Sequence, residues 1–270
     1  MSATLETAAP VAERVGTVAV TGCGLYIPGV DGAFPPGEEH RLLGRKGLLY
    51  KEQATRLALC AVHRALGLPP GAPRADGPPD PATAVVASSN LGNVATVRKV
   101  VETLREGSGR DVSPLDAPNA SSNVVASTVA IWFRFGGPNL MVCSGATSGL
   151  DAIALGSLLL RAGRASRVVV VGAEPDDEVA RSLRAGVRAG AAALVLEPAE
   201  RAGSGALLSE VRAARAPQAI DLVDDFYGAL GVLQTAIAAG RVSAGEPSVT
   251  VVCGDRADGW RALEVRRAGA

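Results

Sequence analysis

The sequence predicts an α/β protein in which helices cover a parallel sheet. Short strands that are apolar on both faces alternate with segments of helical spacing, and strands of this kind are buried between helix layers. A chain of 270 residues is long enough to bury one large core or two small ones. We expect strands at 15–20, 84–87, 140–143, 168–171, 191–196, 207–211, 248–253 and 262–265, and helices at 51–66, 93–106, 122–133, 150–162 and 227–239.

The first elements have clear start and stop signals. Val15 to Val20 is rich in β-branched residues and ends in a glycine turn, which is typical of a strand. In residues 51–66 apolar side chains recur at helical spacing with charges between them, and Gly67 followed by two prolines ends this helix. Proline, glycine and aspartate make 71–81 a linker that leads into the second strand.

A bend between a strand and a helix is the candidate site. Gly137 and Pro138 turn the chain into the strand at 140–143, small residues follow, and an apolar helix begins at Leu150. We call the segment Ser144 to Gly149 the bend. It presents a side chain at a helix N-terminus, where partial positive charge stabilises a thiolate or an oxyanion. This is the outline of an acyl-enzyme nucleophile turn.

Composition excludes several classes of partner. Lysine plus arginine equals aspartate plus glutamate at 27 each, so no broad field attracts nucleic acid or an anionic membrane. The longest apolar run, 168–172, is too short to cross a bilayer. Four scattered cysteines without a CxxC pair, and an N-terminus that lacks a signal peptide, favour a reduced cytoplasmic setting.

The chain is expected to form one domain. Residues 1–14 resemble a flexible leader, and 15–270 follow as a single unit without a short-period repeat. This unit divides into an N-terminal half, 15–200, and a truncated C-terminal half, 201–270.

Five blocks in sequence order resemble β-ketoacyl synthases of the thiolase-like fold, the condensing enzymes of fatty-acid and polyketide assembly. The resemblance implies a layered αβαβα architecture with a reduced second half, and it covers residues 15–200. The blocks are Val18 to Gly24 with Pro28-Gly29, the helix from Ala54 to Leu66, Asn123 to Asn139, Gly172 to Glu174, and Gly190 to Glu197.

The departures from this family concern its catalytic residues. The family nucleophile is the cysteine of Thr-Ala-Cys-x-Ser-Gly, and both flanking anchors place Ala146 at that position. The histidine of Gly-His-x-x-Gly-Ala-x-Gly corresponds to Asp225, and the His-Gly-Thr motif is absent. His40 and His63 lie on early elements, far from either position. The resemblance therefore implies a vacated nucleophile position and a vacated histidine position, which exclude covalent catalysis in the family's manner.

Other chemistry remains open at the same place. Cys143 is the alternative nucleophile, although a strand cysteine is more commonly a small core residue. Ser144 lacks a partner base and the glycine pattern of a serine elbow. The acidic residues 176–178 and Asp221, Asp224 and Asp225 are interpreted as solvated caps, so we expect no metal and no cofactor.

The densest aromatic cluster lies at the end of the helix that resembles the interface helix of the family. In synthases the side chains of this helix line or plug the acyl tunnel of the partner subunit. The resemblance makes this helix the candidate tunnel and interface segment, although core packing is the alternative for its aromatic residues. The candidates are Asn123, Ser127, Trp132, Phe133 and Phe135.

These observations predict a catalytically inactive ketosynthase-like subunit of a polyketide or fatty-acid type system. The resemblance to chain-length factors implies pairing with an active ketosynthase as a heterodimer, or else a homodimer, and action on an acyl chain held by an acyl carrier protein. The alternative is an atypical acyl-thioester enzyme, a decarboxylase, cyclase or hydrolase that uses the remnant cavity, with or without Cys143. A structural or regulatory binding module is the third class.

Overall fold

The computed structural model describes residues 17–30, 32–71, 77–201, 205–215 and 225–268. The expected leader, 1–14, and Asp221 and Asp224 lie outside these residues. The strands are β1 (Val18–Tyr26), β2 (Thr83–Ser88), β3 (Asn139–Val142), β4 (Arg167–Glu174), β5 (Gly190–Pro198), β6 (Ala206–Leu208), β7 (Arg212–Ala214), β8 (Ser248–Asp255) and β9 (Gly259–Arg267).

The helices agree with the expected positions in all five cases, to within a few residues at each end. The segments that the sequence did not predict are short: α2 (His40–Leu43), α7 (Glu178–Leu183) and the strand β7. The predicted helices are α3 (Gln53–Ala65), α4 (Val94–Glu106), α5 (Val124–Phe133), α6 (Ser148–Arg161) and α8 (Leu230–Ser243).

The sheet has the strand order β3-β2-β4-β5-β1-β6-β9-β7, with β8 paired to β9. Only β3, β2 and β4 run parallel to one another, whereas the other pairs are antiparallel. The expectation of a parallel sheet is therefore wrong for most of the strands. Apolar residues on both faces indicate that a strand is buried, and they carry no information on its direction. β4 and β5 are antiparallel neighbours, and the segment that joins them contains only the six-residue α7, which does not cross the sheet as the helix between parallel strands does.

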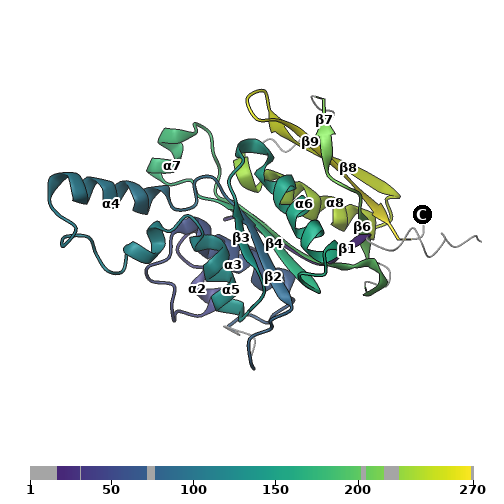
Figure 1. The fold of residues 1–270 in the computed structure, drawn as a ribbon, viewed down its shortest axis with the longest axis horizontal. Coiled ribbons are helices and arrows are strands. Elements are labelled where there is room, and N and C mark those ends of the chain that lie inside the picture. Colours follow the sequence, from purple (N-terminus) through teal and green to yellow (C-terminus); the bar gives the residue numbers. More distant parts are fainter. Residues whose placement is uncertain (1–16, 31, 72–76, 202–204, 216–224, 269–270) are drawn as a thin grey trace, which may run out of the picture.

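Alternating side chains of the buried strands enter two cores on opposite faces of the sheet. Val168 and Val170 of β4 pack with α6 and α8, whereas Val169 and Val171 pack with α3 and α5. The hairpin of β8 and β9 covers the outer side of α8, so the described chain is layered helix, sheet, helix, sheet (Figure 1). This confirms a thiolase-like fold.

The outer face of β8 is open over its first half in the described residues. Val249 and Val251 of β8 belong to the core that β8 shares with α8. On the opposite face Ser248 and Thr250 are exposed, whereas Val252 is buried. No described helix packs on the exposed part of this face. No described helix is long and apolar enough to span a membrane.

Two glycines bring the beginnings of α6 and α8 into close contact. A Cβ atom at Gly149 would lie 2.7 Å from the main-chain nitrogen of Gly231, and a Cβ at Gly231 would lie 2.7 Å from that of Leu150. Only glycine permits so close an approach of two backbones. This crossing joins the bend to the segment that follows Asp225.

Candidate functional site

The candidate site lies at the carboxyl ends of the three parallel strands. β2 leads into Ser89 and Asn90, β3 leads into the bend, and β4 ends at Glu174. The short 3-10 helix Tyr227–Ala229 contacts β4 and the bend and completes the site. Parallel strands place their carboxyl ends at one edge of a sheet, which is where ligand sites of such sheets form.

Glu174 is the buried polar centre of this site. Its side chain is fully buried. Its two carboxylate oxygens accept hydrogen bonds from the main-chain N–H groups of Asn90 (2.7 Å), Leu91 (3.0 Å) and Gly228 (3.2 Å), and from the hydroxyl of Ser89 (3.1 Å). Burial raises the pKa of Glu174 to about 7, although these four donors act in the opposite direction. Glu174 thus connects the segments after β2 and before α8.

Asn90 connects this centre to the bend. Its amide Nδ2 donates to the carbonyl of Gly145 at 2.9 Å, and its Oδ1 accepts the N–H of Gly145 and the hydroxyl of Ser148, both at 3.1 Å. Ser148 also accepts the N–H of Ser144 at 2.7 Å. The side chains of Asn90 and Ser148 therefore hold the backbone of the bend in place.

Ala146 lies in the 3-10 helix Gly145–Thr147 at the start of α6 and is 5% exposed. Its methyl group provides no donor, acceptor or nucleophile. Its main-chain N–H donates to Oδ2 of Asp258 at 2.8 Å. Asp258 belongs to the turn between β8 and β9, so the C-terminal hairpin reaches the bend directly.

Asp225, at the expected histidine position, is held by an arginine. Arg184 Nε lies 2.6 Å from Asp225 Oδ2, and the guanidinium is stacked at 3.9 Å over the ring of Tyr227. Arg184 Nη1 also lies 3.7 Å from Asp255 Oδ2, in the turn that carries Asp258. The residue at this position is therefore a carboxylate engaged by a cation, where the family motif has an imidazole.

The two histidines are remote from this cluster. His63 is buried on α3, which packs on the opposite face of the sheet from α6 and α8. His40 lies on α2, where its Nδ1 is 3.3 Å from the carbonyl oxygen of Gly37. Neither residue faces the bend.

Ser144 has a carboxylate partner that the sequence did not indicate. Its hydroxyl donates to Asp151 Oδ2 at 2.6 Å, and the hydroxyl of Thr147 donates to the same oxygen at 2.7 Å. The other oxygen of Asp151 accepts from Arg261 Nε at 3.1 Å, so the charge of this carboxylate is compensated by arginine. Asp151 therefore joins the bend and α6 to β9 through an ion pair.

Cys143 lies just before the bend, and its environment disfavours the reactive thiolate. Its Sγ is 3.1 Å from the main-chain carbonyl oxygen of Ser89, to which the thiol donates. Burial, and secondly the negative charge of Glu174, raise the pKa of this thiol. A thiolate nucleophile requires a depressed pKa.

The structure divides the candidate tunnel residues into two groups. Trp132 and Phe133 are 3% and 1% exposed and belong to the core beneath α3 and α5, and Phe135 stacks on Phe133 with ring centroids 5.9 Å apart. Asn123 lies nearer the surface, where its Nδ2 donates to Asn139 Oδ1 at 2.6 Å, and Ser127 donates to the carbonyl of Val124 at 3.3 Å. In the isolated chain the two buried aromatics act in packing.

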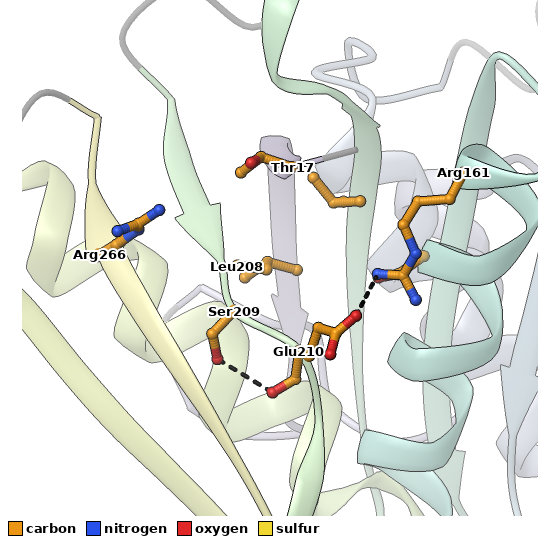
Figure 2. Close-up of a pocket in the computed structure, with 8 residues that line it drawn as sticks. Thr17, Arg161, Leu208, Ser209, Glu210 and Arg266 are labelled. Carbon is orange, nitrogen blue, oxygen red and sulfur yellow. Dashed lines mark hydrogen bonds and ion pairs between the residues drawn. The ribbon is translucent and has the colours of Figure 1, made fainter. Parts of the chain in front are cut away.

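A polar cavity of about 280 Å³ lies at the other end of α6 (Figure 2). Arg161, the last residue of α6, points to Glu210 with 3.8 Å between Nη1 and Oε1, and Arg266 enters from β9. A helix of 14 residues is about 20 Å long. This cavity is therefore separate from the bend.

Several site residues were not predicted from the sequence, among them Asn90, Arg184 and Asp258. Asn90 had a weak signal, since polar residues directly follow a buried strand. Asp258 had one indirect signal, because the family motif carries alanine where this chain has Gly145, and a Cβ at Gly145 would overlap the carboxylate of Asp258. Of the acidic residues near α7, Asp177 is a cap, since it accepts the N–H groups of Val179 and Ala180. Asp176 instead bonds to Gln53 and pairs with Arg181.

The described residues contain no group of three or more histidine, cysteine, aspartate or glutamate side chains that could hold a metal ion.

Comparison with known proteins identifies similar sequences and structures. The family described as "Beta-ketoacyl synthase, N-terminal domain" matches residues 45–193, which is more than half of the chain. A search of curated proteins gave no match.

Three solved structures share the fold. They are the ishigamide ketosynthase/chain length factor, with a TM-score of 0.72 and 20% identity, a type II polyketide synthase acyl-carrier protein in complex with its ketosynthase bound to the hexaketide (0.71, 14%), and a β-ketoacyl synthase from Burkholderia phymatum STM815 (0.69, 14%). Each alignment covers 93% of this chain and 99% of the other.

Proposed function

Because the chain belongs to the β-ketoacyl synthase family, we propose that it is a catalytically inactive subunit of a polyketide or fatty-acid type system. It pairs with an active ketosynthase and shapes the acyl tunnel of that partner. The single observation that carries this proposal is the methyl group of Ala146 at the start of α6, where an acyl-enzyme would need a nucleophile.

The surroundings of the bend support an inactive site. Asp225 is paired with Arg184, and neither histidine of the chain faces the bend. Cys143 has a raised pKa, and the hydroxyl of Ser144 donates to a carboxylate that is already paired with Arg261. Ser144 is the one hydroxyl of this set that contacts a carboxylate, and that carboxylate, Asp151, also holds Thr147 and Arg261.

The edge strand β3 supports pairing with a second subunit. β3 ends the sheet, so among the described residues no strand lies beside one side of its backbone, and such an edge favours pairing with another protein. Leu140 on this strand is 36% exposed, and Ile131 on the adjacent α5 is 74% exposed. Apolar side chains beside an open sheet edge fit an interface.

This geometry changes the residue that we assign to the partner tunnel. Trp132 and Phe133 are buried in the core of this chain, whereas Ile131 of the same helix projects outward. Ile131, together with Asn123 and Asn139, is therefore our candidate for contact with the partner and its acyl chain. An acyl carrier protein would deliver that chain to the active subunit. The setting of such an assembly is cytoplasmic.

The pairing is tested by co-expression with the ketosynthase encoded nearest to this chain, followed by affinity purification and analytical ultracentrifugation. We expect a stable complex, which Ile131→Asp weakens at least about 30-fold, as expected for an interface residue worth 2 kcal/mol. Leu183→Asp is the matched control, because Leu183 is 62% exposed on α7.

Two results would contradict this proposal. One is a chain that remains monomeric with the ketosynthase and in its absence. The other is equal affinity of the Ile131→Asp variant and the unmodified chain.

A further inference from the structure

The turn between β8 and β9 and the residue before it contact both vacated positions of the site, Ala146 directly and Asp225 through Arg184. Asp258 Oδ2 accepts the N–H of Ala146 at 2.8 Å. Asp255 holds the shape of this turn, because its Oδ1 accepts the N–H groups of Ala257 and Asp258, both at 2.9 Å. The other oxygen of Asp255 lies 3.7 Å from Arg184, which pairs with the aspartate at the vacated histidine position. One short acidic segment thus contacts both positions.

The main-chain N–H of Ala146, which donates to Asp258, is a hydrogen-bond donor that acyl transfer at this position would require. When a thiolate adds to a thioester, a new S–C bond forms and the carbonyl oxygen takes up the electron pair; the leaving thiolate departs when the carbonyl reforms. The oxygen needs a preorganised donor while it carries this charge. The N–H of Ala146, at the start of the 14-residue α6, has that position and already has a charged acceptor.

The bend and the turn also fit one another in shape. Gly145 has a φ of 70°, a left-handed conformation that favours glycine. A Cβ at Gly145 would overlap the carboxylate of Asp258. Next to this contact, Arg261 of β9 lies 3.1 Å from Asp151 of α6, so a second charged pair fixes the hairpin to the helix that follows the bend. These contacts hold the carboxylate against the bend.

We propose that the turn between β8 and β9 is a built-in plug of the bend, in which Asp258 occupies the amide that an acyl carbonyl oxygen would otherwise use. The filled donor then adds a further reason for inactivity to the missing nucleophile and the vacated histidine position. Restoring a cysteine at position 146 alone does not restore acylation. This inference rests on the proposed function only in taking residue 146 as the vacated nucleophile position.

The hydrogen bond is tested by amide hydrogen exchange at Ala146, measured by nuclear magnetic resonance. A hydrogen bond to a charged group contributes about 1.5 kcal/mol or more, so we expect Asp258→Ala to accelerate exchange of this N–H at least about tenfold. Glu246→Ala is the control. Glu246 lies on the loop before β8 and pairs with Arg241 of α8, so this variant also removes a paired carboxylate. An exchange rate at Ala146 that is the same in Asp258→Ala and in the unmodified chain would contradict the proposal.

The chemical consequence is tested with the thioester S-octanoyl-N-acetylcysteamine and intact-protein mass spectrometry. We expect the Ala146→Cys variant to remain unmodified and the Ala146→Cys/Asp258→Ala double variant to gain an octanoyl group at position 146. Equal modification of the two variants, whether high or absent, would overturn the inference. Neither measurement involves a partner, so this outcome is independent of whether the chain pairs with a ketosynthase.

Discussion

Gly231→Ala should destabilise the protein by about 3 kcal/mol, which is the upper range for inserting a methyl group into a packed core. The new Cβ would lie 2.7 Å from the main-chain nitrogen of Leu150 and 3.0 Å from the sulfur of Cys253. Main-chain atoms of a buried helix cannot move aside as a flexible side chain does, so α6 and α8 would have to separate at the bend. Urea denaturation followed by circular dichroism measures this change in the free energy of unfolding.

The matched control for this variant lies on the same helix. Gly240 is also within α8, but a Cβ there would meet no heavy atom within 4 Å. Gly240→Ala should stabilise the protein by up to about 1 kcal/mol, because alanine favours a helix interior more than glycine does. Equal effects of the two substitutions would contradict the close crossing of α6 and α8.

Trp132→Ala should cost about 3–5 kcal/mol of stability in the purified chain. The tryptophan is 3% exposed and lies in the core formed by α3, α5 and the sheet. Its removal leaves a large cavity, whereas a residue that only entered the tunnel of a partner would leave the stability of the isolated chain unchanged. Chemical denaturation at a protein concentration low enough to prevent self-association measures the loss.

Ile131→Ala provides the comparison, since Ile131 is the neighbouring residue and is 74% exposed. A surface substitution of this kind should change the free energy of unfolding by less than about 0.5 kcal/mol. A loss below about 1 kcal/mol for Trp132→Ala would show that the tryptophan is not part of the core. Such a small loss would again favour a role of Trp132 in the tunnel of the partner.

The sequence predicted the helices and most strands because apolar periodicity and glycine or proline stops are local signals. Strand direction was not predictable in this way, since β4 and β5 are both apolar on both faces yet run antiparallel. The sequence also did not show which face of α5 is exposed to solvent. This helix is apolar nearly all round, and such a pattern does not distinguish Trp132, which is buried, from Ile131, which is exposed.

The candidate site was predictable only in part. Ala146 and Asp225 could be named because short motifs flank both positions, and the crossing at Gly149 and Gly231 brings those motifs together. The contact of Asp258 with Ala146 joins residues 112 positions apart, and that of Arg184 with Asp225 spans 41 positions. Tertiary folding creates these contacts, so the sequence carries at most an indirect signal for them, such as Gly145 beside Asp258.

Polar and ionic contacts hold the bend and the segment before α8 in place. Asn90 and Glu174 fix the backbone, Asp258 accepts the N–H of Ala146, and Arg184 pairs with Asp225. The proposal of an inactive subunit rests on these contacts together with the methyl group of Ala146. The atypical-enzyme alternative needs a reactive Cys143, for which the raised pKa gives no support.

Acyl labelling of the unmodified protein tests this account most directly. The purified chain is incubated with S-octanoyl-N-acetylcysteamine or with cerulenin, and its intact mass and cysteine-containing peptides are measured. We predict no adduct on any cysteine of the folded protein under conditions that label an active ketosynthase completely. An octanoyl or cerulenin adduct on Cys143 would contradict the account.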